Sequence, residues 1–214
     1  MTSTRSKKKL LRESHLYVIA DKEVLGRSSV CSLVNKIKDS GVDIIQLRGK
    51  ESKKEVVLED ALALRKLLLD SDTFFIINDY LDIAKILDCD GVHLGQTDTP
   101  IEIARGVLGK DKVIGVSCHS LRQAQIAQDK GADYISIGPI FATSTKPEYK
   151  TIGPSLLKEI IKEIKIPFFA IGGINKNNVS EILSRGVKRI AVCSAVCGAR
   201  NPPAIVKYFS KILY

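Results

Sequence analysis

Eight short apolar runs recur along the chain and limit its possible folds more than any other feature. They span residues 15–21, 42–48, 74–79, 91–95, 113–119, 134–140, 167–173 and 189–196. Their starts lie roughly 17 to 33 residues apart, which is the spacing of βα units. Because the runs are rich in β-branched residues and apolar almost throughout, we predict strands covered on both faces, as in a parallel sheet.

The segments between these runs have the periodicity of amphipathic helices, most clearly at residues 54–69, 121–130, 155–164 and 177–185. Glycines at positions 41, 131 and 186 stand just before three of the runs, where glycine caps a helix and turns the chain. An open doubly wound sheet more often has five or six strands and a glycine-rich first turn. We therefore predict an α/β fold, a single (β/α)8 barrel with eight parallel strands over residues 15–214, after a basic tail at residues 1–14.

The composition limits where the protein can be located in the cell and what it can bind. The 214 residues are 44% hydrophobic and 27% charged, which suits one globular domain with a sizeable core. The sequence has no apolar run near the ~18 residues of a transmembrane helix, and its basic start lacks the apolar stretch of a secretory signal. We expect a cytoplasmic protein that does not bind membranes. Monomer and homo-oligomer stay open.

The charge and the cysteines narrow the ligand classes. The formal net charge is +9, and about +4 of it lies in residues 1–14. The sequence has no tryptophan, no basic run in the body of the chain and no nucleic-acid reader motif, so small phosphorylated substrates are favoured over nucleic acid. The five cysteines include no CxxC pair, which argues against a disulfide framework or a zinc site and favours buried, reduced thiols.

Polar residues follow the predicted strands at their carboxyl ends, where barrels of this kind carry their sites. In chain order they are Gln46, Arg48, Lys50, Asn78, Asp79, Asp98, Ser117, His119, Thr143, Ser144, Thr145, Lys146, Gly172, Gly173 and Ser194. One rim therefore gathers carboxylates, cations, hydroxyl groups and a pair of glycines.

These residue types suggest two anion sites of different design. Asp79 and Asp98 are hard oxygen ligands, and Mg²⁺ is usually held by one or two carboxylates together with water and substrate phosphates. Arginine and lysine at the same rim would neutralise a polyanion. The glycine pair and Ser194 end the seventh and eighth runs, where barrels often hold a phosphate against backbone N–H groups.

Each feature alone has a simpler explanation. The glycine pair could be an ordinary turn, Asp79 could cap the following helix, and single lysines are usually solvated. His119 could be a structural histidine, and His15 and His93 are still better candidates for that. The functional interpretation depends on all these features falling on one rim.

As a set, the motifs resemble thiamine-phosphate synthases, in that family's order from about Leu16 to Phe209. They are QLRGK at 46–50, IND at 77–79, GVHLGQTD at 91–98, GVS at 115–117, GPIF at 138–141, TSTK at 143–146, GGI at 172–174 and SA at 194–195. Tyr80 and Thr97 depart from the usual pattern beside the implied metal ligands. The resemblance implies a transferase of thiamine biosynthesis that joins a pyrimidine pyrophosphate to a thiazole phosphate and releases pyrophosphate.

The resemblance also implies a role for each matching position. Asp79 and Asp98 would hold Mg²⁺. The pyrimidine pyrophosphate would contact Gln46, Leu47, Arg48, Gly49, Lys50, Asn78, Ser117 and Lys146. The thiazole phosphate would contact Thr143, Ser144, Thr145, Gly173, Cys193 and Ser194. Arg48, Ser117 and Lys146 would act on the reacting groups.

Two alternatives remain at this stage. A thiazole tautomerase would share the barrel and the thiazole-phosphate site, and His119 would matter there, but an isomerase has little use for the pyrophosphate-binding set. A non-catalytic phosphate-binding regulator could use the same scaffold, because fold alone does not fix function.

Overall fold

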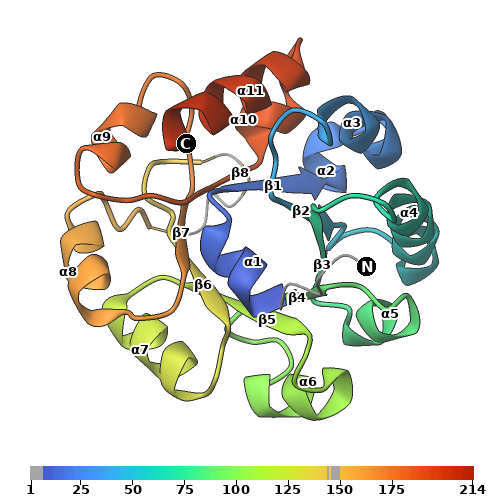
Figure 1. Cartoon of the computed structure of the whole chain (residues 1–214), viewed down its shortest axis with the longest axis horizontal. Helices are drawn as coiled ribbons and strands as arrows, with labels where there is room; N and C mark the ends of the chain where they lie inside the picture. Colours follow the sequence, from blue (N-terminus) through green and yellow to red (C-terminus); the bar gives the residue numbers. More distant parts are fainter. Residues whose placement is uncertain (1–6, 144, 146–149) are drawn as a thin grey trace.

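The computed structural model describes residues 7–143, 145 and 150–214; residues 1–6, 144 and 146–149 are outside this description. Eight parallel strands pair in chain order, and β8 pairs with β1 to close a barrel (Figure 1). The strands are β1 Leu16–Asp21, β2 Ile44–Arg48, β3 Phe74–Asn78, β4 Gly91–Leu94, β5 Val113–Cys118, β6 Tyr134–Ile137, β7 Phe168–Ile171 and β8 Ile190–Val192. The predicted (β/α)8 barrel is confirmed.

Helices surround the barrel, and one further helix, α1 (Lys7–Glu13), lies in the middle of the ring of strands in Figure 1. The outer helices are α2 Lys22–Leu25, α3 Val30–Ile37, α4 Lys54–Leu67, α5 Leu81–Ile86, α6 Ile101–Leu108, α7 Leu121–Asp129, α8 Leu156–Glu163, α9 Val179–Leu183, α10 Ser194–Cys197 and α11 Pro202–Leu213. Gly41, Gly131 and Gly186 have φ of 91°, 86° and 88°, the left-handed backbone expected of them before the strands.

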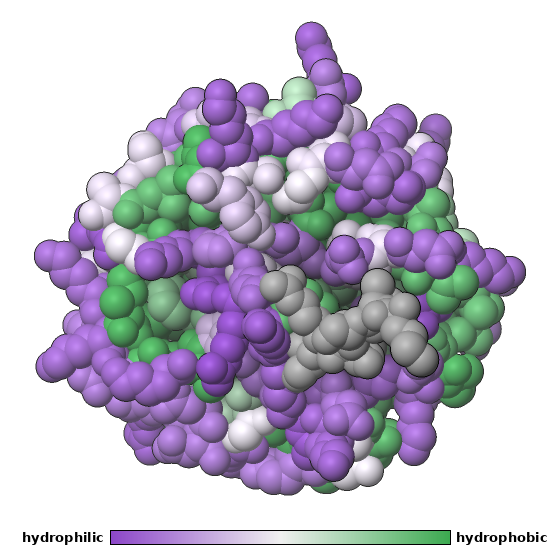
Figure 2. Space-filling view, viewed as in Figure 1, coloured by the Kyte–Doolittle hydropathy of each residue, from purple (hydrophilic) through white to green (hydrophobic). Residues whose placement is uncertain are grey.

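Strand alternation divides the apolar residues into two layers. On β2, Ile45 and Leu47 pack outward into the large core between the barrel and the helices, whereas Ile44 packs inside the barrel. Hydrophilic residues predominate on the outer surface in Figure 2, with hydrophobic residues in the gaps between them. Within the described residues, the longest apolar helices fall short of what a membrane crossing would need.

The described part of the predicted basic tail belongs to the fold. Helix α1 covers one end of the barrel, and its Leu11 is 2% exposed among the interior side chains of Tyr17, Ile44 and Phe74. Arg189 donates from Nη2 to the carbonyl of Arg12 at 2.6 Å. The basic composition hid this role, because Lys8 and Lys9 stay at the surface while Leu11 enters the interior.

The strands are shorter than the apolar runs that predicted them, most clearly at the last one. The run at 189–196 contains β8 up to Val192, and then α10 starts at Ser194. Apolar character continues across this change, and a short apolar run fits a strand or a buried helix equally well. Cys193 is therefore a half-buried residue at the start of α10 and not part of a strand.

Candidate active site

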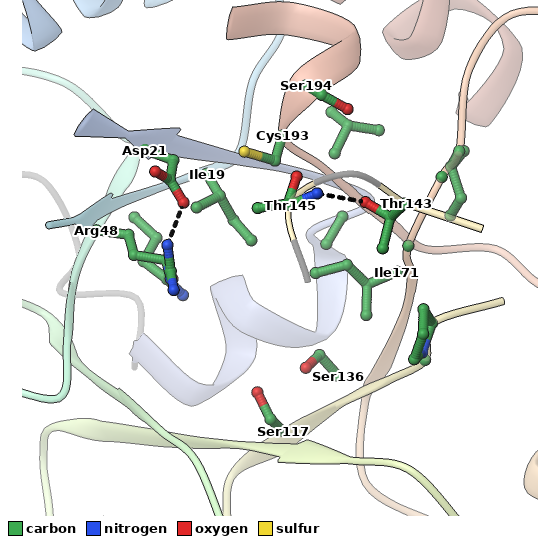
Figure 3. Close-up of a pocket in the computed structure, with 18 of the residues that line it drawn as sticks. Ile19, Asp21, Arg48, Ser117, Ser136, Thr143, Thr145, Ile171, Cys193 and Ser194 are labelled. Carbon is green, nitrogen blue, oxygen red and sulfur yellow. Dashed lines mark hydrogen bonds and ion pairs between the residues drawn. The ribbon is translucent and has the colours of Figure 1, made fainter. Parts of the chain in front are cut away.

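A pocket opens at the carboxyl ends of the strands (Figure 3). Nine of the residues predicted to bind substrate line it: Gln46, Arg48, Asn78, Ser117, Thr143, Thr145, Gly173, Cys193 and Ser194. They come from six different strands and the segments that follow them. The barrel thus brings together side chains up to 148 positions apart in the chain, Gln46 and Ser194.

Arg48 is fixed at one wall by a carboxylate. Its Nη1 donates to Oδ2 of Asp21 at 2.5 Å (Figure 3). The same Nη1 lies 3.4 Å from Oε2 of Glu23. Burial acts to lower the pKa of Arg48, but the charge and the hydrogen bond of Asp21, together with the charge of Glu23, raise it overall. Asp21 also accepts from the backbone N–H groups of Glu23 and Val24, so its position is set by the start of α2. Both carboxylates contact Nη1, so the guanidinium keeps further donors for a ligand.

Asp79 and Asp98 form a second charged feature beside this wall. The two side chains are hydrogen-bonded to each other, although they follow different strands. Burial, the hydrogen bond with Asp98 and its charge raise the pKa of Asp79 from 3.8 to about 6, against the opposing charges of Lys50 and Arg48. Asp79 has a φ of 61°, an uncommon backbone for a residue other than glycine. Two carboxylates held in contact are a natural site for a cation.

The two carboxylates do not line the main pocket. Asp79 faces a neighbouring hollow with Tyr80, and Asp98 accepts from the backbone N–H of Gly95 at 2.6 Å. Within the residues that the structure describes, no group of three or more His, Cys, Asp or Glu side chains could hold a metal. A metal here would depend on two carboxylates and on oxygens from a ligand.

The opposite wall is built from close backbone contacts. Gly172 and Gly173 have φ of 100° and 63°, and a Cβ on Gly173 would lie 2.3 Å from the carbonyl oxygen of Ala142. Thr145 donates its backbone N–H to Oγ1 of Thr143 at 3.3 Å, and Ser194, which is exposed, lies on the same side of the pocket (Figure 3). The glycine pair is therefore required by packing, and it also leaves backbone near the pocket free of side chains.

The other predicted site residues lie in three different surroundings. The Leu47 side chain is fully buried between barrel and helices, so only its backbone could contribute to a site. Gly49 is buried against Lys22 and Val57, and Lys50 is exposed near Asp79. Ser144 and Lys146 lie outside the described residues.

Several pocket residues were missed by the sequence prediction. Asp21 ends the first strand and met the same rule that selected Asn78 and Asp79, so the signal was present. His93 and Ser136 lie on the inward face of their strands, 6% and 3% exposed, and line the pocket with Ser117. His119, which the sequence did place on the rim, also lines the pocket, with its Nδ1 2.6 Å from the carbonyl oxygen of Gly138.

All five cysteines are free thiols, as expected, but they are not all buried. The hydrogen bond with Cys197 and burial raise the pKa of the pocket-lining Cys193 thiol well above its ordinary value. A protonated thiol is a poor nucleophile, so the pocket is not arranged for cysteine catalysis.

Comparison with known proteins places these features in a family. A family model described as thiamine monophosphate synthase matches residues 16–196. A thiamine-phosphate synthase of Halalkalibacterium halodurans is 41% identical over 95% of this chain and 97% of its own. One of Lawsonia intracellularis is 40% identical over 89% and 88%. The solved thiamine phosphate pyrophosphorylase from Pyrococcus furiosus superposes with a TM-score of 0.86 at 37% identity, covering 95% of this chain and 97% of that one.

Proposed function

The chain belongs to the thiamine monophosphate synthase family, and on that premise we propose that it joins a (diphosphooxymethyl)pyrimidine to a thiazole phosphate, releasing pyrophosphate. The family predicted from the motifs is confirmed. The single observation that most supports the proposed residue roles is the division of the pocket. Arg48 lines one side of the pocket, with the paired carboxylates and Lys50 next to it outside the lining, and a glycine-lined rim with hydroxyl groups stands on the other side.

The charged side suits a pyrophosphate leaving group. Arg48 is already oriented by Asp21, so the side chain loses little freedom when an anion binds. Lys50 adds a second positive charge near Asp79. Lys146 would add a third, as the motif implies. Charge that develops on a departing pyrophosphate is stabilised best by donors that are in place beforehand.

Asp79 and Asp98 would hold a magnesium ion together with oxygens of the pyrophosphate. The residues fit such an ion because Asp79 lies against a second carboxylate, and the charge of that neighbour helps to raise the pKa of Asp79. When bound, the ion would neutralise charge on the leaving group and orient it. Mg²⁺ that shares its shell with phosphates is usually held by one or two protein carboxylates, which this pair supplies.

The chemistry asks the chain for positioning more than for a nucleophile. In the family's dissociative reaction, pyrophosphate leaves first and the thiazole nitrogen attacks the resulting pyrimidine-methylene cation. Gln46, Asn78 and Ser117 are in reach of one pocket and would orient the pyrimidine ring. Walls such as Ile19 and Ile171 would exclude water that could capture the cation.

The glycine-lined side would hold the thiazole phosphate. Gly173, the start of α10 at Cys193–Ser194 and the hydroxyl of Thr143 line the same part of the pocket. Backbone N–H groups and hydroxyls bind a phosphate without adding positive charge. The thiazole phosphate would therefore be held separately from the cation-rich side.

An assay of product and pyrophosphate from the two substrates with Mg²⁺ tests the proposal. We expect one pyrophosphate released for each thiamine phosphate formed, and loss of both when Mg²⁺ is chelated. A thiazole tautomerase or a phosphate-binding regulator would release no pyrophosphate. Product formation at an undiminished rate under chelation would overturn the magnesium part alone.

A further inference from the structure

A continuous line of hydrogen bonds runs through the barrel interior and joins two residues of the pocket. Gln46 donates from Nε2 to the Tyr17 hydroxyl at 2.6 Å, and the Tyr17 and Tyr134 hydroxyls are 3.0 Å apart. The Tyr134 hydroxyl lies 3.1 Å from Nδ1 of His93, whose Nε2 lies 2.9 Å from Oγ of Ser117. We call this series of five residues the interior relay.

The interior relay buries polar side chains, and burying them costs free energy unless each one is hydrogen-bonded. Tyr17, Gln46, His93 and Tyr134 are all at most 6% exposed, in a position where barrels usually pack branched aliphatic side chains. Each buried polar group requires a partner, and a single missing bond leaves a desolvated donor or acceptor. An apolar interior would stabilise the fold equally well. The polar series is therefore better explained by its effect on the side chains at its two ends, Gln46 and Ser117.

Gly115 makes the central contact of the relay possible. It stands in register between His93 on β4 and Tyr134 on β6. A Cβ at Gly115 would lie 2.0 Å from Cζ of Tyr134, so the tyrosine ring occupies the space of the missing side chain. The glycine in this strand thereby lets the Tyr134 hydroxyl reach across β5 to His93.

The orientation of the Gln46 amide sets the direction of every bond in the series. Tyr17 accepts from Gln46 and donates to Tyr134, which in turn donates to Nδ1 of His93. His93 then carries its proton on Nε2 and donates to Oγ of Ser117. If Tyr134 donated to Tyr17 instead, the buried Tyr17 proton would have no acceptor among the described residues.

We propose that the interior relay positions Ser117 and Gln46 for the pyrimidine, so that the Ser117 hydroxyl donates its proton into the pocket while Gln46 presents its carbonyl oxygen there. Oγ of Ser117 accepts from His93, which leaves its own O–H for a ligand. Ser136, whose Oγ lies 3.3 Å from the same Nε2, supports the imidazole from the neighbouring strand. Tyr17, Tyr134 and His93 are positioning residues, and this inference rests on the proposed function for the identity of the ligand.

The first test compares Tyr134→Phe, which removes one hydroxyl and keeps the ring, with Thr73→Val. Thr73 is a buried control whose hydroxyl donates to the carbonyl of Val42, away from the pocket. We expect Tyr134→Phe to lower kcat/KM for the pyrimidine pyrophosphate about tenfold, and to change KM for the thiazole phosphate less than about twofold. Thr73→Val should lower Tm comparably and leave both kinetic constants unchanged.

The same change in a Ser117→Ala background separates positioning from general damage. We expect Tyr134→Phe to cost less than about twofold there, because its effect passes through Ser117. A tenfold loss in both backgrounds, or an equal kinetic loss in Thr73→Val, would overturn the proposal.

A second measurement does not depend on turnover. The chain has 3 histidines, so nitrogen NMR can assign His93. We expect protonated Nε2 and unprotonated Nδ1 in the neutral ring. A proton on Nδ1 would mean that the series runs the other way and would refute the proposed direction. Wild-type protein that makes no product would instead refute the proposed function while the NMR result stands.

Discussion

Three aspartates at the amino end of the barrel and the Asp79–Asp98 pair at the carboxyl end are held in different ways. At the amino end, Asp43, Asp90 and Asp133 each accept from a backbone N–H of a neighbouring strand, at 2.7 to 2.9 Å. At the carboxyl end, Asp79 and Asp98 contact each other, and the pKa of Asp79 is raised. The three amino-end carboxylates are thus bonded within the chain, as is Asp21 at the carboxyl end, whereas Asp79 lies against a second carboxylate. This pair is the part of the carboxyl end that suits a cation.

The difference shows how one barrel separates stability from function. The three amino-end aspartates precede β2, β4 and β6, so alternate strands are fastened by the same device. Helix α1 then covers this end and buries Leu11. Because the amino end is closed and well bonded, the fold can tolerate two carboxylates that repel each other at the carboxyl end. Their repulsion is relieved when a ligand binds there.

The largest expected effect is at the carboxyl end. Asp79→Ala should lower kcat/KM about a hundredfold or more, because charge on the departing pyrophosphate loses its stabilisation. Its unfolding free energy should not fall, since the substitution removes a repelled carboxylate. Steady-state kinetics and urea unfolding of the same sample measure both. Near-normal turnover would remove Asp79 from the proposed site.

At the amino end we expect the opposite result, a loss of stability without a loss of activity. Asp43→Ala removes the acceptor for the backbone N–H groups of His15 and Leu16, and should cost about 2–3 kcal/mol of unfolding free energy. The kcat of the folded fraction should stay at the wild-type value. Asp39→Ala, at a side chain that is 82% exposed, is the matched control and should change stability by less than about 0.5 kcal/mol. A kcat loss in Asp43→Ala would break the separation of the two ends.

A smaller effect concerns pH and Mg²⁺. Because the pKa of Asp79 is about 6 in the fold and 3.8 ordinarily, its protonated form is favoured by folding. That stability is fully present below pH 3.8 and is lost as the pH rises through 6. At pH 8, Asp79→Asn should therefore gain on the order of 1–2 kcal/mol over the wild type. Added Mg²⁺ should raise Tm of the wild type and leave that of Asp79→Asn unchanged, which calorimetry can measure.

The smallest effect is expected at Lys50, whose exposed ammonium is screened by solvent. Lys50→Ala should raise KM for the pyrimidine pyrophosphate about fivefold, or about 1 kcal/mol, and leave the thiazole phosphate nearly unchanged. Lys53→Ala, at a nearby exposed lysine, should change neither. Equal losses for both substrates would show that the two sides of the pocket are not separate.

The sequence predicted the barrel because its signal is local and repeated eight times. The period of apolar runs and the glycine caps do not depend on which strands finally pair. The role of α1 could not be predicted, because the residues that bury Leu11 come from strands that are distant in the sequence. The same limit applies to the length of β8, where an apolar run continues into α10.

The site was predicted in outline by one rule, polar residues at strand ends. That rule selected Arg48 and Ser117, which line the pocket, and could have selected Asp21. The motif added Leu47, whose side chain the two-residue strand period already directs away from Arg48 and toward the helices. His93 was discounted because a lone histidine carries little information until its partners are known.

Pairing of β8 with β1 also has a consequence for synthesis of the chain. Leu16 has Ile190 as its register partner, so one edge of the first strand has no neighbour until nearly all of the chain has left the ribosome. During that interval the exposed edge of β1 could pair with another nascent chain. Helix α1, made before every strand, can cover the apolar interior only after closure supplies it. We expect ribosome-bound chains that end before residue 190 to be open to protease at β1, and to become resistant once β8 has emerged.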